Sequence, residues 1–301
     1  MDPVRTAQDI KSMKTRGALK IAIAAAKSLR DYSDGYSGGQ DKFLKDLERN
    51  GRILKNSRPT AVSLPNAVNY VIYMAKNTPD RKELVGKIDD FMDEQRGALE
   101  RIAEIGSKRI EEGDTILTHC NSMTALETIR AAWDSGKKIT VVATETRPRH
   151  QGYLTSKYMA KHRIPVTLII DSAVRFAMRK LDVDKVLIGA DTVCANGAVI
   201  NKIGTSQVAL VAKESNVPVM CACETIKFSP ETMLGELVEI EDRDHREIRG
   251  PIRGVKMLNP AFDFTPPEYV DVIVTEDGII SPYMAYEVLR DKFSWDLKKH
   301  G

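Results

Sequence analysis

The sequence predicts an α/β protein in which an N-terminal helical domain precedes a domain built on a mostly parallel sheet. Residues 1–105 carry helical patterns and show no period-2 alternation of apolar and polar residues. From Gly106 onward, short apolar runs of β type alternate with helical stretches, which is the pattern of βαβ units. We therefore expect one domain over 1–105 and a second over 106–301.

Helix formers in the first domain are interrupted by loop signals. Residues 21–26 are rich in isoleucine and alanine, and a Gly- and Ser-containing loop at 34–39 ends that helix. Further helices are expected over 42–50, 64–76 and 82–105, with Gly51 ending the first of these.

The second domain alternates strands and helices. The strands are expected near 116–117, 139–143, 166–170, 186–188, 217–222 and 270–274, and the helices near 122–135, 153–161, 172–180 and 205–214. The strands are continuous apolar runs, which predicts that helices bury both faces of the sheet.

Composition limits the function classes. Of 301 residues, 42% are hydrophobic and 29% charged, which favours a globular core over disorder. The 45 basic and 42 acidic residues are too balanced for nucleic acid as the main partner. There is no signal peptide, no transmembrane run, no disulfide framework and no zinc-type cysteine spacing, so we expect a cytoplasmic protein without membrane attachment and without a bound metal.

Cys120 lies between the end of a strand and the start of a helix, for which Ser122 is a good N-cap. In a parallel sheet this is where ligands bind, and a helix amino end can hold phosphate and lower the pKa of a thiol. The alternative is that Cys120 is a small buried core residue. His119 points to the opposite side of the strand and is read as a hydrogen-bonded core histidine.

Polar residues follow three other strands. Asp191, Lys202 and Lys227 lie in loops after predicted strands, where an open parallel sheet places its active site. Taken singly, Asp191 could equally be the cap of a turn, and an isolated lysine such as Lys202 or Lys227 is usually a surface residue. In the helical domain, Arg16 at a helix start and Arg58 before a proline add two more basic loops. Together these suggest a ligand with two separated anionic groups.

A set of motifs spread over residues 12–290 resembles a known superfamily. The motifs are Arg-Gly-Ala at 16–18, Arg-Pro-Thr-Ala-Val at 58–62, Thr-His-Cys-Asn at 118–121, Glu-Thr-Arg-Pro-x-x-Gln-Gly at 145–152, Gly-Ala-Asp at 189–191, Asn-Gly-x-x-x-Asn-Lys-Ile-Gly-Thr at 196–205 and Asn-Pro-x-Phe-Asp-x-Thr-Pro-Pro at 259–267. They resemble the superfamily that joins the alpha, beta and delta subunits of initiation factor two-B with two sugar-phosphate isomerases. Within it, the isomerases keep the residues that stand here as Cys120 and Asp191, and the residues around 58–66 look most like the archaeal ribose-1,5-bisphosphate isomerases.

The resemblance implies a Rossmann-like second domain and an isomerase that converts ribose-1,5-bisphosphate to ribulose-1,5-bisphosphate in nucleotide salvage. Cys120, as a thiolate, would take the C2 proton, and Asp191, kept partly protonated, would act as the acid for ring opening. The alternatives are a related methylthioribose-1-phosphate isomerase, or a non-catalytic regulatory subunit of the initiation factor. The residues that would hold the phosphates and the sugar are Arg16, Gly17, Ala18, Leu19, Arg58, Ser122, Met123, Thr124, Asn201, Lys202 and Lys227.

The resemblance also implies the partners. The substrate would be a phosphorylated sugar, AMP is a candidate activator, and no cofactor is implied. The chain would form a homo-oligomer based on dimers, up to a hexamer.

Overall fold

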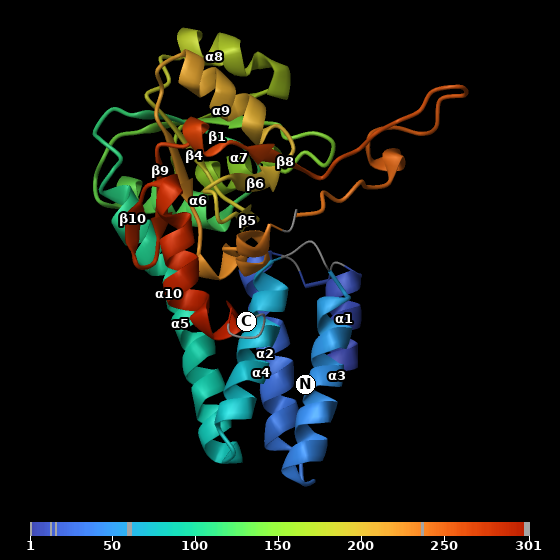
Figure 1. Cartoon of the computed structure of the whole chain (residues 1–301). Helices are drawn as coiled ribbons and strands as arrows, with labels where there is room; N and C mark the ends of the chain where they lie inside the picture. Colours follow the sequence, from blue (N-terminus) through green and yellow to red (C-terminus); the bar gives the residue numbers. More distant parts are fainter. Residues whose placement is uncertain (1, 13, 16, 59–61, 236–237, 298–301) are drawn as a thin grey trace.

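The computed structural model describes residues 2–12, 14–15, 17–58, 62–235 and 238–297. A bundle of long helices forms one half of the molecule, and a sheet covered by helices forms the other (Figure 1). The bundle helices are α1 (Pro3–Lys11), α2 (Ala18–Asp34), α3 (Gln40–Lys55), α4 (Ser63–Asn77) and α5 (Arg81–Ser107). The α/β class is therefore confirmed.

The bundle packs closely at one glycine. We expected Gly51 to end a helix, and this was wrong, because α3 continues through it to Lys55. Gly51 is buried, and a Cβ atom there would lie 2.9 Å from side-chain atoms of both Ile72 and Val68 on α4. The glycine serves the contact between α3 and α4, which offsets its cost in helix propensity.

The main sheet has seven strands in the order β10-β9-β7-β4-β1-β2-β3, parallel except for β10. The strands are β1 (Thr115–Thr118), β2 (Thr140–Thr144), β3 (Val166–Ile169), β4 (Lys185–Ile188), β7 (Val219–Ala222), β9 (Val272–Thr275) and β10 (Gly278–Ile280). All six predicted strands are present. β10 was not predicted, because its three residues are too few to show a pattern.

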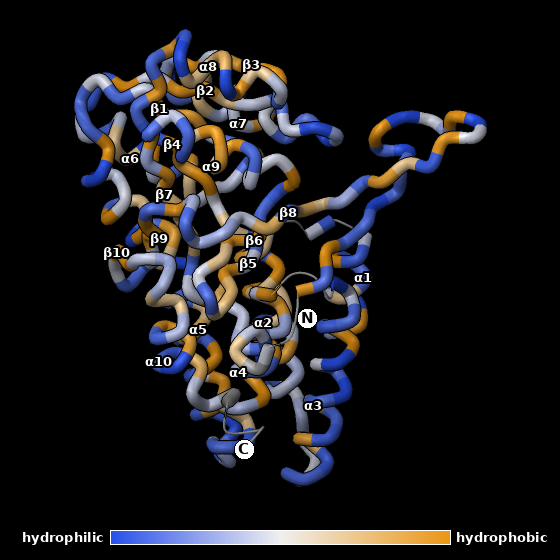
Figure 2. The backbone as a smooth tube through the Cα atoms, turned by 45° about the horizontal axis from the view of Figure 1, so that its top comes forward, coloured by the Kyte–Doolittle hydropathy of each residue, from blue (hydrophilic) through white to orange (hydrophobic). Residues whose placement is uncertain are grey.

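Helices cover both faces of this sheet. Neighbouring residues of one strand enter different cores: Ile116 packs with α5, α6 (Met123–Asp134) and α7 (Gly152–Lys161), whereas Leu117 packs with α8 (Val174–Lys180), α9 (Thr205–Glu214) and α10 (Ala285–Leu297). The central strands and covering helices carry much of the hydrophobic colour in Figure 2. The edge strand β3 is different, since Thr167 and Leu168 are exposed, so the expectation of two buried faces was wrong there.

A second, three-stranded sheet was missed by the sequence prediction. It consists of β5 (Thr192–Val193), β6 (Val199–Lys202) and β8 (Phe262–Thr265), all antiparallel. The residues read as one loop over 196–205 form a hairpin turn followed by β6. Asn196 accepts from the Ala198 N–H, and Gly197 has φ of +84°, so the Asn-Gly pair acts as a hairpin turn.

Short 3₁₀ helices connect these elements: η1 (Asp171–Ala173), η2 (Thr225–Lys227), η3 (Pro230–Leu234), η4 (His245–Glu247), η5 (Pro267–Tyr269) and η6 (Pro282–Met284). The segment around η4 projects from the body as an arm in both overall views (Figures 1 and 2). The predicted boundary at 105/106 falls inside α5, which runs unbroken to Ser107 and packs on α6.

Candidate active site

The order in which the chain adds strands to the sheet reverses between β1 and β4. From β1 the chain adds β2 and β3 on one side, and β4 then pairs with the other side of β1. A crevice outside the carboxyl ends of two such strands is the usual ligand site of an open parallel sheet. Cys120 follows β1 and Asp191 follows β4, so the two predicted catalytic residues flank this point.

Gly189 lets the two loops approach each other. A Cβ atom at Gly189 would lie 2.2 Å from the Oγ of Ser122 and 2.5 Å from its Cβ. Ser122 caps α6 as predicted, with its Oγ accepting from the Ala125 N–H at 3.4 Å. The Gly189–Asp191 turn therefore lies directly against the amino end of α6.

Neighbouring hydroxyl groups hold the Cys120 turn. Cys120 has φ of +72°, a strained value for a residue with a side chain. Its N–H donates to Thr146 Oγ1 at 2.9 Å, and its carbonyl accepts from Thr155 Oγ1 at 2.7 Å. The Sγ donates to Gln151 Oε1 at 3.4 Å. A strained backbone held by several contacts is a feature of functional sites.

The pKa of Cys120 differs from the expectation. Burial raises the pKa of the thiol to about 12; Lys202 acts to lower it and Asp191 to raise it. The lowered pKa expected from the helix amino end was therefore wrong for the protein without substrate. The desolvation of a thiolate in this turn outweighs the field of one helix end and one lysine.

His119 does not form a dyad with Cys120. It is buried, its Nδ1 lies 2.6 Å from Thr144 Oγ1, and its Nε2 lies 2.8 Å from the carbonyl of Ile203. Burial lowers the pKa of its imidazole. His119 thus joins β1, β2 and the turn before α9, as expected of a hydrogen-bonded core histidine.

Asp191, Asn201 and Lys202 lie on or beside the small sheet. The Asp191 N–H donates to the Ile200 carbonyl at 2.9 Å, which ties the β4 loop to β6. Within the described ranges, no side-chain hydrogen bond holds its carboxylate. Asn201 is buried and donates to Thr205 Oγ1. The Lys202 ammonium donates to the Ala261 carbonyl at 2.9 Å. The chemistry that this arrangement offers is a thiol, a carboxylate and an ammonium around one strand-end crevice.

Lys227 is paired more tightly than the sequence suggested. Its Nζ lies 2.7 Å from Glu224 Oε2, and the two residues are 6% and 2% exposed. Burial acts to lower the pKa of Lys227, but Glu224 and other nearby groups raise it above its usual value. Glu224 Oε1 also accepts from Thr124 Oγ1 at 3.4 Å. The side chains of Thr124 and Lys227, both predicted to bind substrate, therefore contact the same carboxylate.

The bundle residues lie at the end that faces the sheet. Asn66 of α4 donates through Nδ2 to the carbonyls of Ile226 and Phe228, both at 2.8 Å. Ser63 of α4 donates to the Ala18 carbonyl at 3.0 Å, so the starts of α2 and α4 lie together. Arg58 follows the end of α3 and is half-buried.

The remaining predicted contacts are placed as follows. Gly17 caps α2 with φ of +91°, and Leu19 lies in its first turn. Arg16 lies outside the described residues. Met123 begins α6, and its side chain is 41% exposed.

Several site residues were missed from sequence. Gln151, Thr146 and Thr155 hold Cys120, and Glu224 and Asn66 hold Lys227 and its turn. Their motifs were visible, but a hydroxyl or amide that supports another residue carries no distinct spacing signal. Within the described ranges, no three His, Cys, Asp or Glu side chains are close enough to hold a metal ion. None of the described helices is long and apolar enough to cross a bilayer.

Comparison with known proteins gives consistent matches. The ribose 1,5-bisphosphate isomerase of Methanocaldococcus jannaschii is 46% identical over 300 residues, covering 98% of this chain and 97% of that protein. The enzyme of the same name from Thermococcus kodakarensis is 48% identical, covering 97% and 95%. The crystal structure of the Pyrococcus horikoshii translation initiation factor eIF-2B superposes with a TM-score of 0.79 at 28% identity, covering 93% of this chain and 97% of that one. The model of the Initiation factor 2 subunit family matches residues 14–282, and the chain belongs to this family.

Proposed function

We propose that this protein is an aldose–ketose isomerase that converts ribose-1,5-bisphosphate to ribulose-1,5-bisphosphate. The observation that carries the proposal is the position of Cys120 and Asp191 on either side of the β1/β4 crevice. It is supported by near-full-length identity to proteins that bear this enzyme's name. The regulatory subunits of the resemblance generally lack both residues, which favours an enzyme over a non-catalytic subunit.

The reaction needs four proton transfers. A proton reaches the ring oxygen as the bond from that oxygen to C1 breaks. The C2 proton leaves, which gives an enol phosphate with a C1–C2 double bond. The C2 hydroxyl then loses its proton while C1 gains one, which leaves a ketone at C2 and a phosphate ester at C1. Asp191 is proposed as the acid at the ring oxygen and Cys120 as the base at C2.

The raised pKa of Cys120 adds a requirement to this scheme. A thiol with a pKa of about 12 is almost wholly protonated at neutral pH, so the base must form in the substrate complex. Lys202 already acts to lower this pKa. We propose that Lys202 stabilises the thiolate in the substrate complex, and that Gln151 keeps the sulfur oriented.

The two phosphates are proposed to bind at opposite sides of the crevice. The first turn of α6 at Ser122, Met123 and Thr124, together with Asn201 and Lys202, would hold one. Gly17, Ala18 and Leu19 at the start of α2, with Arg16 and Arg58, would hold the other. Lys227 would act on the phosphates through its charge and not by direct contact, because its ammonium is paired with Glu224.

A coupled assay with ribose-1,5-bisphosphate tests the proposal. Cys120→Ser and Asp191→Asn are each expected to lower kcat about 10²–10⁴-fold. The matched control is Cys194→Ser, since Cys194 is also a free cysteine but lies in the β5–β6 hairpin. Near wild-type turnover by Cys120→Ser would reject the assignment. Preferential turnover of methylthioribose-1-phosphate would point to the related isomerase. Inactivity on both, with capture of an initiation factor, would point to a regulatory subunit.

A homodimer through the β3 edge is proposed from the exposed apolar residues there. β3 ends the sheet, and Leu154, Leu168, Ile170 and Phe176 of this region are 44–70% exposed. An open edge beside apolar side chains is a pairing surface that stable monomers avoid. We expect Leu168→Glu to halve the mass measured by light scattering, and Leu210→Glu, at an exposed leucine of α9, to leave it unchanged.

The remaining proposals follow the same resemblance. The four free cysteines are consistent with the reducing cytoplasm. AMP is proposed as an activator, which the isomerase assay with and without AMP tests directly. A hexamer built from three dimers would be visible in the same light-scattering measurement.

A further inference from the structure

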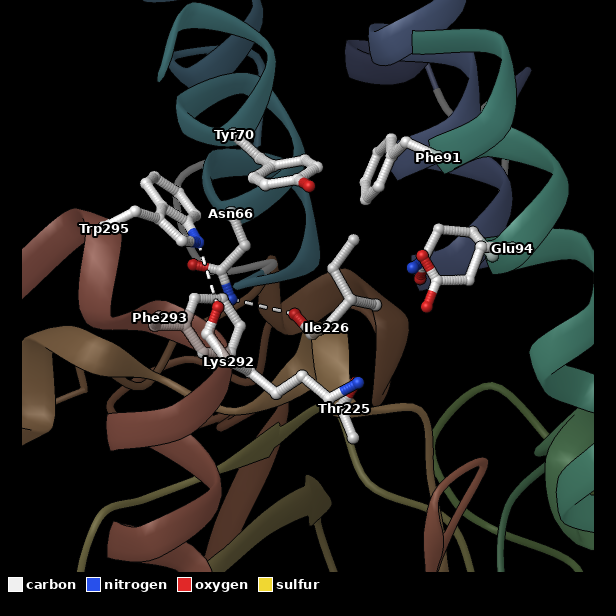
Figure 3. A pocket seen from close by; sticks show the side chains of 10 residues that line it. Asn66, Tyr70, Phe91, Glu94, Thr225, Ile226, Lys292, Phe293 and Trp295 are labelled. Atoms are coloured by element: carbon white, nitrogen blue, oxygen red, sulfur yellow. Dashed lines mark hydrogen bonds between the residues drawn. The ribbon is translucent and has the colours of Figure 1, made fainter. Parts of the chain in front are cut away.

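A cavity of about 210 Å³ lies between the helical bundle and the end of α10, apart from the strand-end crevice. Four aromatic side chains line it: Tyr70, Phe91, Phe293 and Trp295 (Figure 3). The ring centroid of Tyr70 lies 4.9 Å from that of Phe91 and 5.3 Å from that of Trp295. The cavity exceeds the engineered cavity of about 150 Å³ that takes up benzene, so it can hold a group the size of an amino-acid side chain.

One charge of each sign lines the cavity. Glu94 and Lys292 both belong to its wall. Lys292 is paired with Asp277 at 2.8 Å. This pair offsets the ammonium of Lys292, so among the described lining residues the Glu94 carboxylate is the charge left beside the aromatic rings.

An acceptor in the wall lacks a donor. Gln95 lines the cavity and is 93% buried, given its exposed fraction of 7%. Its Oε1 accepts no hydrogen bond from any residue that the structure describes. A buried acceptor without a donor is costly, and a ligand that donates a hydrogen bond would relieve this cost.

We propose that this cavity is a binding site for a small organic cation, either a guanidinium or an alkylammonium group. The aromatic faces attract a cation, Glu94 supplies the opposite charge, and Gln95 can accept an N–H. A neutral apolar ligand would leave the Glu94 carboxylate and the amide acceptor unmatched. An anion would face the Glu94 carboxylate.

The cavity adjoins the turn that carries Lys227. Ile226 and Thr225 of η2 line it, and so does Asn66, which donates to the Ile226 carbonyl (Figure 3). A cation bound against Ile226 would restrict the motion of η2 and so favour one position of Lys227. This link to the substrate site rests on the proposed function, whereas the binding of a cation does not.

Fluorescence of Trp295 gives a binding signal that needs no isomerase activity. The chain has two tryptophans, so Trp133→Phe leaves Trp295 as the reporter. We would titrate this variant with n-butylguanidinium chloride at constant ionic strength, with neutral pentanamide as the comparison. A saturable change is expected for the cation and none for the amide. Glu94→Gln should weaken binding about tenfold. Glu100→Gln, an exposed glutamate of the same helix outside the cavity, should not.

The proposal would be overturned by the absence of a saturable change, by an equal response to pentanamide, or by undiminished binding to Glu94→Gln. If binding is found, the KM for ribose-1,5-bisphosphate is measured with and without the cation, and a change of about threefold or more is expected. Binding without isomerase activity would reject the proposed function and keep the cation site. Isomerase activity without cation binding would reject the cation site and keep the proposed function.

Discussion

The buried pair of Glu224 and Lys227 should be costly to break. Lys227 is only 6% exposed, and Glu224→Gln removes the counter-charge of its ammonium. Removing one partner of a buried pair typically costs about 3–5 kcal/mol. Lys227→Met should cost a similar amount, because among the described residues only Thr124, which donates to Oε1, would then contact the Glu224 carboxylate. The double variant should cost less than the sum of the two single changes, by about 2 kcal/mol or more, since both charges are gone.

Urea unfolding followed by circular dichroism measures these free energies. The control is Glu104→Gln, which breaks an exposed pair with Lys108 and should leave the free energy of unfolding nearly unchanged. In Glu224→Gln, burial acts on Lys227 and is opposed by Asp191 instead of by the directly paired Glu224, so the folded pKa of Lys227 should fall below its unfolded value. The folded state then binds fewer protons, and the variant should gain stability as pH rises towards 10. Additive single costs, or single costs below about 1 kcal/mol, would refute this reasoning.

Three further predictions concern the crevice and the turn before α9. Without substrate, Cys120 should react with iodoacetamide about 10²–10³-fold more slowly at pH 8 than an ordinary thiol, and its reaction rate should rise with pH up to about pH 11. The rate is measured from the alkylated peptide by mass spectrometry. A rate that reaches a plateau below pH 9 would contradict the raised pKa. Burial raises the pKa of Asp263 to about 6. Between pH 4 and 6 this carboxyl is therefore more protonated in the folded state than in the unfolded state, and the free energy of unfolding should fall by about 2 kcal/mol as the pH rises from 4 to 6. The Asp263 carboxylate accepts from the N–H groups of Gly204 and Ser206 at the start of α9. Asp263→Asn keeps an oxygen that can accept there and should remove that fall in pH-dependent urea unfolding. Gly189→Ala should destabilise the protein by about 1–3 kcal/mol through its clash with Ser122, and Ser122→Gly in the same chain should restore part of the loss.

The periodic features of the fold were predictable from sequence. The apolar runs that became β1, β2, β4, β7 and β9 are buried on both faces, and burial on both faces is what produces a continuous run. β3 had the same pattern and is exposed on one edge. Sequence alone cannot distinguish an apolar run on an exposed edge strand from one on a buried central strand.

The misjudged positions depended on tertiary contacts. Gly51 is a helix breaker by propensity, but its packing against α4 outweighs this preference. The thiol pKa depends on how much water reaches Cys120, which a strand–turn–helix pattern does not reveal. Lys227 looked like a free strand-end cation because its partner, Glu224, is three residues away in a turn that only the fold closes.

The most direct test of the central claim is to follow ribose-1,5-bisphosphate with the protein in D₂O by proton and phosphorus NMR. Proton transfer through Cys120 and Asp191 predicts ribulose-1,5-bisphosphate that carries solvent deuterium at C1, with formation slowed about 10²–10⁴-fold by Cys120→Ser. Full transfer of the substrate's C2 hydrogen to C1, with no solvent deuterium there, would contradict the proton-transfer chemistry. No conversion at all would contradict the assignment of the protein as this isomerase.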